Sequence, residues 1–317
     1  MKKAVIGIDL GGTNIKAGAV DMEGRVLTRH RRPTGAEAGP KGVADRICKA
    51  ALNCMDALED HRIAGVGVGS PGTIDLEEGV VLFSPNMPGW DDIPLREWIE
   101  TELDRPCVLE NDANAAALGE QWVGAGRGTD SLVMFTLGTG IGGGIVLGGR
   151  VWHGTGGFAG EIGHMCIDPE GPECGCGSRG CIEAHASATG MVRRMQQEID
   201  AGRQTALAEK SGDFTAKDIY DAAVEGDEAA QENFQETARF LGVAISNMLH
   251  ILNPAVVVLS GGVTAAGDML LKPIRAEVRR RTMEACQRDV RISIAELGED
   301  AGFIGAARSF MNRHPEA

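Results

Sequence analysis

The sequence has no apolar run long enough to cross a membrane. A spanning helix needs about 20 consecutive, mainly apolar residues, and no stretch of the 317 residues approaches that length. Met1-Lys2-Lys3 is typical of the start of a signal peptide, but Asp9 interrupts the apolar stretch after it and so excludes a secretory segment. We therefore expect a cytoplasmic protein with no membrane partner.

The sequence also has fewer basic than acidic residues. The chain carries 31 Lys and Arg against 45 Asp and Glu, a formal net charge of −14. Such a balance repels nucleic acid and anionic lipid. The two short basic clusters, residues 29–32 and 279–281, are typical of solvated faces. We find no helix-turn-helix ahead of residue 3, so nucleic acid is not an expected partner.

Glycine, in contrast, is abundant. There are 45 glycines, about twice the share usual in globular proteins, and twenty of them lie between Gly124 and Gly190. No G-x-y period accompanies them, which excludes collagen. Concentrated glycine in a globular chain indicates backbone that turns tightly or approaches a ligand closely.

Strand-like and helix-like segments alternate along the chain, which predicts an α/β fold with parallel elements. The expected strands are residues 3–10, 15–21, 25–31, 63–68, 107–110, 131–137, 145–147, 150–151, 255–259 and 290–295. The expected helices are residues 43–58, 113–123, 227–252, 268–283 and 302–311.

A unit of strand, glycine turn, strand, turn and strand occurs twice, at residues 3–31 and again at 131–151. Leu10-Gly11 matches Leu137-Gly138, and residues 24–26 match residues 149–151. Chance similarity of two glycine-rich hairpins is one interpretation. A duplicated nucleotide-binding half is the interpretation that we favour.

Glycine turns follow three apolar strands, at Gly11, Gly138 and Gly261. Phosphate binding needs backbone N–H groups that converge on an anion, and glycine permits that approach. A tight hairpin would explain one such turn, but three favour a nucleotide site. Lys16 could supply a positive charge to a phosphate or be an exposed strand lysine. Asp9 could hold Mg²⁺ directly or through water.

The spacing His164-x₉-Cys174-x-Cys176-x₄-Cys181 predicts a metal site. One imidazole and three thiolates form the closed tetrahedral set of a structural Zn²⁺, and four unrelated core residues are the alternative. In a reducing compartment, crowded cysteines indicate metal rather than disulfides. Cys166 is expected to be a spare thiol. The remaining cysteines are expected to be buried core thiols: Cys48, Cys54, Cys107 and Cys286.

Carboxylates gather around this metal-binding segment. Glu161 lies three residues before His164, and Glu183 lies two residues after the last cysteine, so metal binding would draw both carboxylates together. Paired acceptors suit the vicinal hydroxyls of a sugar, although surface salt bridges are an equal alternative. Asp112, where a strand meets a helix, could cap that helix or accept the proton of an attacking hydroxyl.

Together these residues resemble the bacterial sugar kinases of the repressor–open reading frame–kinase (ROK) group, most closely its ATP-dependent glucokinases. The match covers nearly the whole chain. Its markers are Asp9-Leu10-Gly11-Gly12-Thr13-Asn14, Ser70-Pro71-Gly72, Glu110-Asn111-Asp112, Leu137-Gly138-Thr139-Gly140, Gly160-Glu161-Ile162-Gly163-His164, Cys174-Gly175-Cys176-Gly177 and Cys181-Ile182-Glu183.

The resemblance implies the actin-like ATPase fold, which is ribonuclease H-like, with two lobes and a central cleft. The small N-terminal lobe is expected to comprise residues 1–112. The C-terminal helix, about residues 302–317, crosses back to it. The large lobe is expected over residues 113–301 and contains a zinc loop at 164–181. The family also suggests a homodimer.

The resemblance also implies roles for single residues. Asp112 would be the general base that aims the 6-hydroxyl of the sugar at the γ-phosphate, and His164 would contact both zinc and the sugar. The implied substrate-binding residues are Gly72, Asn86, Asn111, Asp112, Glu161, His164 and Glu183, with Trp90 close to Asn86. The implied cofactor-binding residues are Asp9, Gly11, Gly12, Thr13, Asn14, Lys16, Gly138, Thr139, Gly140, Gly261 and Gly262. His185 departs from the pattern, because relatives often have tyrosine after Glu-Ala.

The expected reaction is transfer of the γ-phosphate of MgATP to glucose, which gives glucose 6-phosphate and ADP. ATP, Mg²⁺ and a structural Zn²⁺ are the implied cofactors. A kinase for N-acetylglucosamine, N-acetylmannosamine, mannose or fructose is the nearest alternative. A sugar-sensing regulator without catalysis is another, which Asp112 and the intact glycine turns disfavour. An actin-like chaperone would have no use for the zinc loop.

Overall fold

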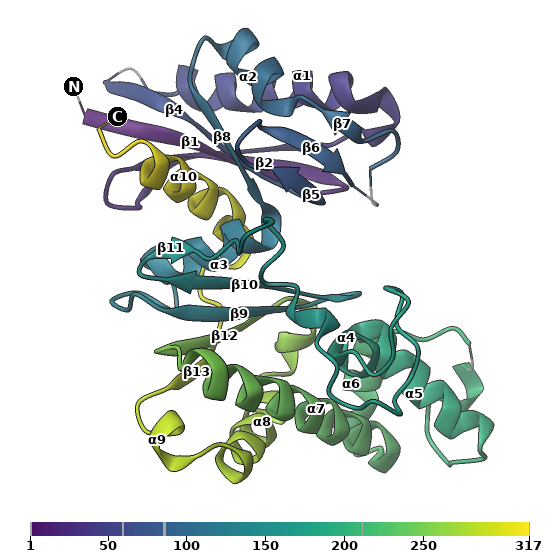
Figure 1. Cartoon of the computed structure of the whole chain (residues 1–317). Helices are drawn as coiled ribbons and strands as arrows, with labels where there is room; N and C mark the ends of the chain where they lie inside the picture. Colours follow the sequence, from purple (N-terminus) through teal and green to yellow (C-terminus); the bar gives the residue numbers. More distant parts are fainter. Residues whose placement is uncertain (1, 59, 85–86, 211, 317) are drawn as a thin grey trace. The chain divides into compact units, whose positions relative to one another are not determined.

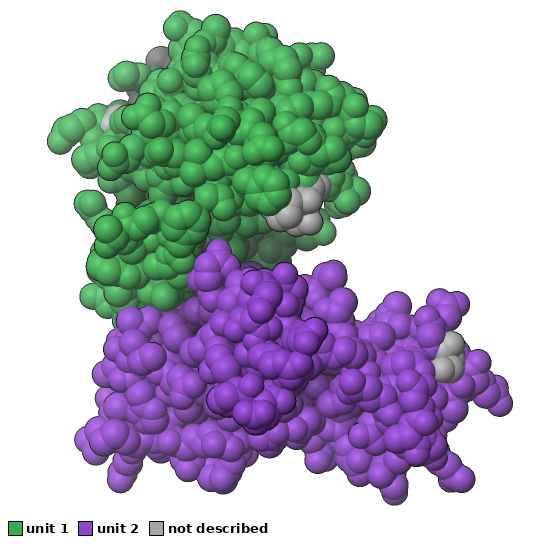
Figure 2. All heavy atoms as spheres, turned by 45° about the vertical axis from the view of Figure 1, so that its right-hand side comes forward, with its two compact units in different colours: residues 1–132, 144–160, 296–317 green, residues 133–143, 161–295 purple. Residues whose placement is uncertain are grey.

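The computed structural model describes residues 2–58, 60–84, 87–210 and 212–316. The chain divides into two compact units, which Figure 2 distinguishes by colour. Unit 1 comprises Met1–Leu132, Gly144–Gly160 and Glu296–Ala317, and unit 2 comprises Val133–Gly143 and Glu161–Ala295. Among the described residues, no helix combines the length and the apolar character that a membrane crossing requires.

A five-stranded sheet forms the centre of unit 1 (Figure 1). Its order is β3-β2-β1-β4-β8. The first three strands pair antiparallel, and β4 and β8 continue the sheet in parallel with β1. The bounds are β1 Lys2–Leu10, β2 Asn14–Asp21, β3 Val26–Pro33, β4 His61–Ser70 and β8 Cys107–Asn111.

The register of this sheet places three polar side chains at one edge. Asp9 of β1 pairs with Gly69 of β4, and Ser70 pairs with Asn111 of β8. These residues lie at the carboxyl ends of parallel strands, where open α/β sheets bind their ligands. The apolar strands therefore deliver Asp9 and Asn111 to the same end of the sheet.

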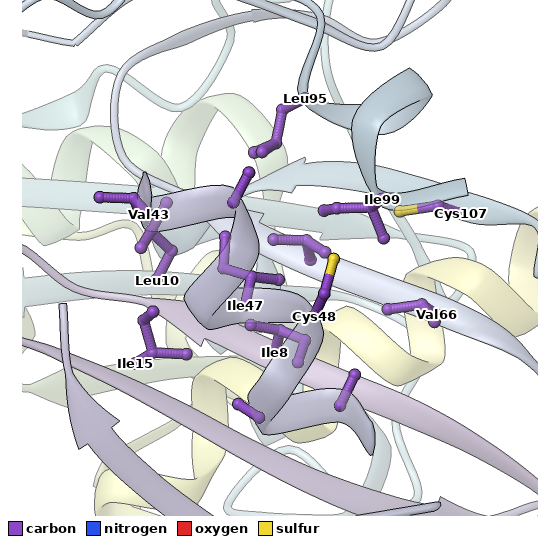
Figure 3. Close-up of a cluster of buried hydrophobic side chains, with 14 of the residues drawn as sticks. Ile8, Leu10, Ile15, Val43, Ile47, Cys48, Val66, Leu95, Ile99 and Cys107 are labelled. Carbon is purple, nitrogen blue, oxygen red and sulfur yellow. The ribbon is translucent and has the colours of Figure 1, made fainter. Parts of the chain in front are cut away.

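Helices cover both faces of this sheet. Helices α1 (Gly39–Asp56) and α2 (Leu95–Leu103) bury their apolar sides against one face. Figure 3 shows Val43 and Ile47 of α1 beside Ile8 and Leu10 of β1. Helix α10 (Ala301–Arg313) packs on the other face through Phe303 and other apolar residues. Helix α3 (Asp112–Val123) contacts α10.

Glycines without a place in any turn let α10 approach its neighbours. A Cβ atom at Gly7 of β1 would lie 1.8 Å from the carbonyl oxygen of Phe303. A Cβ atom at Gly305 would lie 1.6 Å from the carbonyl oxygen of Ala115 in α3. No side chain fits at these distances, so glycine is required where α10 packs backbone to backbone.

A three-stranded sheet that the sequence did not predict also belongs to unit 1. Its order is β5-β6-β7, from β5 (Thr73–Asp75), β6 (Val80–Phe83) and β7 (Asp91–Ile93). Strands of three or four residues are too short for an alternation of apolar and polar residues to be recognised.

The second five-stranded sheet repeats the order of the first. It runs β11-β10-β9-β12-β13, with β9 Leu132–Leu137, β10 Ile141–Leu147, β11 Arg150–Val151, β12 Val256–Ser260 and β13 Arg291–Ile294. The boundary between the units falls inside β9 and β10. In both sheets three consecutive strands are followed by two later ones, which confirms the predicted duplication.

Two details of the prediction were wrong. Strand β10 begins at Ile141, ahead of the predicted start at residue 145. The glycines of residues 142–144 hid this part of the strand, and at Gly143 a Cβ atom would lie 2.2 Å from the side chain of Ile162. Cys286 is half-exposed, since it lies in the short helix α9 (Glu284–Gln287), which buries no residue.

Helices account for most of unit 2. The longest is α7 (Glu228–Leu252), which begins one residue after the predicted start. Asp227 caps it by accepting a hydrogen bond from the amide of Ala230 at 2.9 Å. The others are α4 Ile182–Ala186, α5 Ala188–Asp200, α6 Ala216–Val224 and α8 Asp268–Arg281. Short 3₁₀ helices occur at Ala36–Ala38, Ile162–His164, Ala208–Lys210, Gly262–Ala266 and Gly298–Asp300.

Candidate active site and metal centre

The four predicted metal ligands meet in unit 2. The ligand atoms of His164, Cys174, Cys176 and Cys181 all lie within 4.8 Å of one another. The Sγ atom of Cys174 lies 3.6 Å from Nδ1 of His164, and the Sγ atoms of Cys176 and Cys181 are 3.7 Å apart. One imidazole and three thiols at these separations fit a closed tetrahedral site of the zinc type.

Local backbone structure holds the four residues in place. His164 ends a short 3₁₀ helix, and Cys181 immediately precedes α4. Between them the amide of Cys174 donates to the carbonyl of Ser178 at 2.8 Å, and Gly177 turns with φ of +87°. Cys166 is exposed and lies outside the group.

Two carboxylates lie beside this cluster. Oε2 of Glu161 is 3.9 Å from Nε2 of His164, and Oε1 of Glu183 is 3.7 Å from the Sγ atom of Cys174. Because Nδ1 of His164 faces a thiol, its Nε2 is the nitrogen on the carboxylate side. The side chain of Glu161 is 68 % exposed. The predicted gathering of Glu161, His164 and Glu183 is therefore present in unit 2.

The second glycine turn touches the same group. The other oxygen of Glu183, Oε2, accepts a hydrogen bond from the amide of Ile141 at 2.9 Å. A Cβ atom at Gly140 would lie 2.4 Å from this oxygen, so glycine is needed for the turn to approach the carboxylate. The turn after β9 thus contacts Glu183, which is one of the predicted sugar-binding residues.

The same turn also packs on the start of α5 and on the third glycine turn. The carbonyl of Gly138 accepts a hydrogen bond from the amide of Ala188 at 2.9 Å, and the hydroxyl of Thr189 donates to the carbonyl of Thr139 at 2.6 Å. A Cβ atom at Gly261 would lie 2.3 Å from the carbonyl oxygen of Leu137. Two of the three predicted turns therefore lie together, beside a helix N-terminus that favours anions.

A pocket of about 330 Å³ opens next to these two turns. Its wall is mainly apolar, and Tyr220 and Phe234 supply aromatic rings. This size is typical of small-molecule sites. The lining residues are Gly138, Thr139, Ala188, Thr215, Ala216, Lys217, Tyr220, Phe234, Gly262, Val263, Ala265 and Ala266. Only the glycines and Thr139 of this set were predicted, because the others come from helices whose sequence carries no binding motif.

The first glycine turn belongs to unit 1. It is closed by a hydrogen bond from the amide of Gly11 to the carbonyl of Asn14 at 3.0 Å. The hydroxyl of Thr34 donates to the carbonyl of Gly11 at 2.6 Å. Gly12 and Thr13 are exposed, so the turn offers its backbone to a ligand. Lys16 lies 3.8 Å from a carboxylate oxygen of Glu299.

Asp9 precedes this turn in an unusual electrostatic setting. Burial raises the pKa of Asp9 from 3.8 to about 6; the Lys16 ammonium opposes this shift, and the carboxylates of Asp112 and Glu299 add to it. A Cβ atom at Gly302 of α10 would lie 2.7 Å from the Asp9 carboxyl carbon. The fold therefore brings the carboxylate of Asp9 close to that of Asp112. A bound cation would reduce the repulsion between the two negative charges.

Asn111, and not Asp112, caps helix α3. Oδ1 of Asn111 accepts hydrogen bonds from the amides of Ala113 at 3.0 Å and Asn114 at 3.2 Å. Its Nδ2 donates to the carbonyl of Gly72 at 3.4 Å. Asp112 is the first residue of the helix. Oδ1 of Asp112 also accepts a hydrogen bond from the amide of Ala113 at 2.8 Å. The N-cap position belongs to Asn111, however, so the alternative interpretation of Asp112 as the cap is wrong.

A buried hydrogen-bond network that the sequence did not reveal supports Asn111. The Glu110 side chain is 1 % exposed and receives three bonds. They come from Nε2 of His153 at 2.9 Å, the hydroxyl of Ser309 at 3.1 Å and the amide of Asn111 at 3.0 Å. A buried carboxylate requires such partners. Glu110 in an apolar strand was the available signal, but its partners lie 43 and 199 residues away.

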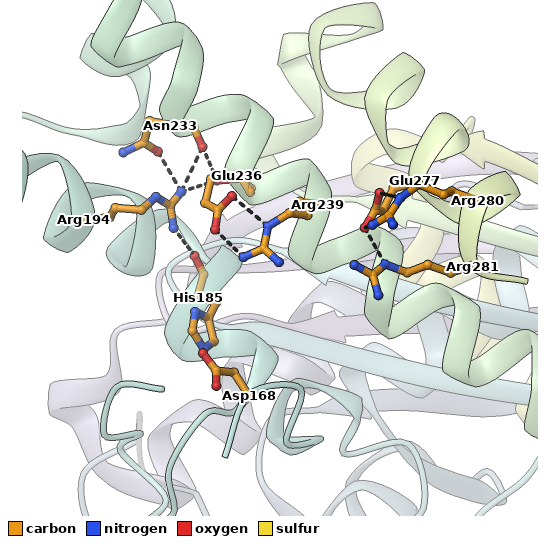
Figure 4. Close-up of polar contacts among 10 residues, drawn as sticks. Asp168, His185, Arg194, Asn233, Glu236, Arg239, Glu277, Arg280 and Arg281 are labelled. Carbon is orange, nitrogen blue, oxygen red and sulfur yellow. Dashed lines mark hydrogen bonds and ion pairs between the residues drawn. The ribbon is translucent and has the colours of Figure 1, made fainter. Parts of the chain in front are cut away.

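Two other noted residues, Trp90 and His185, are buried. Asn86 lies outside the described residues. Trp90 is 2 % exposed in the unit 1 core. His185 is also buried, with its ring 4.0 Å from that of Phe240 and its Nε2 4.0 Å from the Asp168 carboxylate (Figure 4). Burial lowers the pKa of His185. His185 therefore packs between Phe240 of α7 and Asp168 of the segment that carries the predicted metal ligands.

Two sheets of equal order, each with a glycine turn after its first strand, define a protein of the actin-like ATPase class. The model of the ROK family matches residues 5–312, and the chain belongs to this family. Both the fold and the family that the sequence resemblance implied are thus confirmed.

Similar proteins are known in sequence and in structure. A glucokinase of Thermotoga maritima is 40 % identical over 98 % of both chains. A ROK hexokinase from Thermus thermophilus superposes with a TM-score of 0.84 at 35 % identity, over 98 % of this chain and 99 % of the other. A ROK family glucokinase from Streptomyces griseus, solved with glucose and AMPPNP, gives 0.77 at 38 % identity over 96 % and 98 %.

Proposed function

We propose that the protein is an ATP-dependent hexose kinase that transfers the γ-phosphate of ATP to the 6-hydroxyl of glucose. The observation that carries this proposal is the grouping of Glu161, His164 and Glu183 at the predicted metal site. Within this group, Glu183 contacts the glycine turn after β9. The glucokinase relatives and the related structure with glucose and AMPPNP support it.

The residues of unit 2 supply the proposed sugar clamp. Carboxylates accept hydrogen bonds in pairs and so suit the neighbouring hydroxyls of a pyranose. His164 and the three cysteines would hold Zn²⁺, which would supply structural order to the segment. With Nδ1 facing the thiols, Nε2 of His164 is left for a sugar hydroxyl. Gly72 and Asn111 are the proposed sugar contacts from unit 1.

The nucleotide is proposed to use the glycine turns. The adenosine moiety would occupy the pocket lined by Tyr220 and Phe234, and its phosphates would bind the backbone of residues 138–140 and 261–262. Residues 11–14 and Lys16 are the proposed phosphate contacts of unit 1. Asp9 is the proposed Mg²⁺ ligand, because a carboxylate with a pKa raised to about 6 gains from a nearby cation.

Asp112 is the proposed general base. Phosphoryl transfer proceeds through a loose transition state, in which orientation of the attacking hydroxyl and late proton acceptance are the main demands. Asp112 begins α3 directly after the capping residue Asn111, so its backbone position is fixed. Its carboxylate would orient the 6-hydroxyl and take up the proton as the O–P bond forms.

The other expectations from the sequence belong to the same proposal. The catalytic lobes are residues 1–112 with 302–317 and residues 113–301. The protein acts in the cytoplasm as a homodimer, without nucleic acid or membrane partners. The nearest alternatives are the same reaction on another hexose and sugar binding without catalysis.

A coupled ADP-release assay across a hexose panel tests the proposal. We expect the highest kcat/KM with glucose and lower values with mannose, fructose, N-acetylglucosamine and N-acetylmannosamine. A higher value with another hexose would keep the reaction and change the substrate. If no hexose released ADP while glucose still bound, the kinase proposal would be wrong and the regulator favoured.

A further inference from the structure

A second pocket in unit 2 is built from different residues. Its volume is about 470 Å³, and it lies among α8, α9 and β13. It shares no lining residue with the pocket beside Gly138. The lining residues are Arg275, Val278, Arg279, Gln287, Arg288, Val290, Arg291, Ile292 and Ser293. We call it the arginine pocket.

The arginine pocket concentrates positive charge in an acidic protein. Four of its nine lining residues are arginines and none is Asp or Glu, although the whole chain has a net charge of −14. Like charges that converge on one hollow repel one another. Such an arrangement favours the binding of an anion in the pocket.

The neighbouring arginines of α8 show the usual alternative. Glu277 pairs with Arg280 at 2.8 Å and also with Arg281, as Figure 4 shows. Within the described part of the chain, Arg279 next to them pairs with no carboxylate. Arg288 and Arg291 likewise have no ion pair to any described residue. In this region, the described arginines without a carboxylate partner thus include Arg279, Arg288 and Arg291, which all line the pocket.

Regular structure and hydrogen bonds fix the walls of the pocket. Nη2 of Arg275 donates to the carbonyl of Ile292 at 2.6 Å and so joins α8 to β13. Nε2 of Gln287 donates to the carbonyl of Thr282 at 3.0 Å and holds α9 against the end of α8. Arg291 is anchored by strand pairing with Val256. Arg275 and Arg279 of α8 and Arg291 of β13 therefore project from regular backbone.

We propose that the arginine pocket binds a small phosphate-bearing molecule. Guanidinium groups present paired donors that match phosphate oxygens, and several of them bind such an anion better than one. The volume suits a ligand of sugar-phosphate or diphosphate size. The phosphate can be free or carried on a sugar. The buried side chains of Val278 and Ile292 give the pocket an apolar floor. This site is separate from the proposed catalytic residues and does not depend on their assignment.

Isothermal titration of the full chain tests the proposal. Glucose and a non-hydrolysable ATP analogue are kept at saturation, so that phosphate sites of the proposed active centre are filled. Inorganic pyrophosphate is the first probe and glucose 6-phosphate the second, at low ionic strength where charge pairing is strongest. We expect one saturable site per chain. Binding of pyrophosphate alone would identify free phosphates as the ligand, and binding of the second probe a sugar phosphate.

Variants locate the binding. The double variant Arg279→Gln/Arg288→Gln should weaken probe binding at least about tenfold, because charge-assisted hydrogen bonds are lost. Arg280→Gln removes the same charge from the same helix outside the pocket and should bind as the wild type does. Thermal melting checks that each variant is folded, and Arg291→Gln replaces the double variant if that one is not. No saturable binding of either probe, or equal binding by the wild type and the pocket variants, would overturn the proposal.

Discussion

The two five-stranded sheets share one strand order but differ in the residues and segments around their glycine turns. In the first sheet Asp9 precedes the turn, and β4 comes after a single long helix. In the second sheet Thr136 takes the place of Asp9 when Leu137 is matched with Leu10. About a hundred residues then separate β11 from β12. They contain the four predicted metal ligands and residues of the pocket lined by Tyr220.

This difference teaches that the duplicated scaffold and the chemistry are separable. Both copies provide a strand that ends in a partly exposed glycine turn, whose backbone amides can bind an anion. In the first copy the strand that leads into the turn carries the Asp9 carboxylate. In the second copy the turn instead contacts the Glu183 carboxylate, which belongs to the long segment that contains the Cys₃His group. As parts of the proposed function, we therefore assign cation binding and base catalysis to unit 1, and adenosine recognition and the carboxylates of the sugar clamp to unit 2.

The largest expected effect tests the catalytic role of unit 1. Asp112→Asn should lower kcat by about 10²–10⁴, because a positioned base contributes that much to proton transfer. Glucose binding, measured by titration, should remain near the wild-type value if recognition belongs to unit 2. Asp45→Asn, at an exposed carboxylate of α1, is the control. If the turnover of Asp112→Asn were near that of the control, the proposal that Asp112 is the general base would be wrong.

The next effect tests the predicted zinc-binding segment of unit 2. Purified protein should contain about one zinc per chain. Cys181→Ser should lose this zinc and reduce kcat/KM for glucose by about 10² or more, because loss of a ligand exceeds the 10- to 100-fold effect of outer contacts. Cys166→Ser, at an exposed thiol outside the cluster, should keep zinc and activity. Full activity of a zinc-free preparation would contradict this assignment.

A smaller effect tests the hydrogen-bond network beside the proposed base Asp112. His153→Ala should destabilise the fold by about 1–3 kcal/mol, because the buried Glu110 carboxylate loses a donor. It should also lower kcat about tenfold with little change in the KM for ATP, since Asn111 bonds to the same carboxylate. His153→Gln retains a donor and should restore most of kcat. If His153→Gln were as impaired as His153→Ala, the positioning role would be refuted.

The smallest effect concerns the charge of Asp9. Because its pKa is raised from 3.8 to about 6, the folded state binds more protons than the unfolded state in this window, and stability falls as pH rises through it. Asp9→Asn removes the charge, so without Mg²⁺ its Tm should exceed that of the wild type by a few degrees above pH ~7 and match it near pH ~4.

Thermal melting at both pH values, with and without Mg²⁺, provides the measurement. Added Mg²⁺ should raise the Tm of the wild type above pH ~7 and so reduce the gap, if Asp9 holds the cation. The control Asp45→Asn should show no gap that depends on pH. Parallel melting curves for Asp9→Asn and the wild type at every pH would show that burial of Asp9 has no such cost.

Sequence alone predicted the elements with strong local signals. The runs that became β1, β9 and β12 are apolar because both faces of their sheets are covered, and α7 has an apolar face and a clear N-cap. The metal ligands were predictable because all four fall within 18 residues, so their spacing is local. The duplication was visible because glycine is needed at the same place in both copies.

The rest depends on contacts between distant segments. Tyr220 and Phe234 line a pocket with Gly138 and Gly262 only after three helices have packed. The bonds from His153 and Ser309 to Glu110 join residues far apart in sequence. Neither pattern has a fixed spacing, and short strands such as β5 and β7 carry too few residues for a periodic signal. Tertiary packing, and not local propensity, decides these features.

The position of α10 has a consequence for biosynthesis. This helix is the last element of the chain, yet it covers a face of the sheet that contains β1, with Phe303 and Phe310 buried there. Domains usually fold as they leave the ribosome, at about 5–20 residues per second. Unit 1 has to wait while Glu161–Ala295 of unit 2 is synthesised, a delay on the order of ten seconds. During that time the apolar face of its sheet is exposed, and we expect a chaperone to bind it.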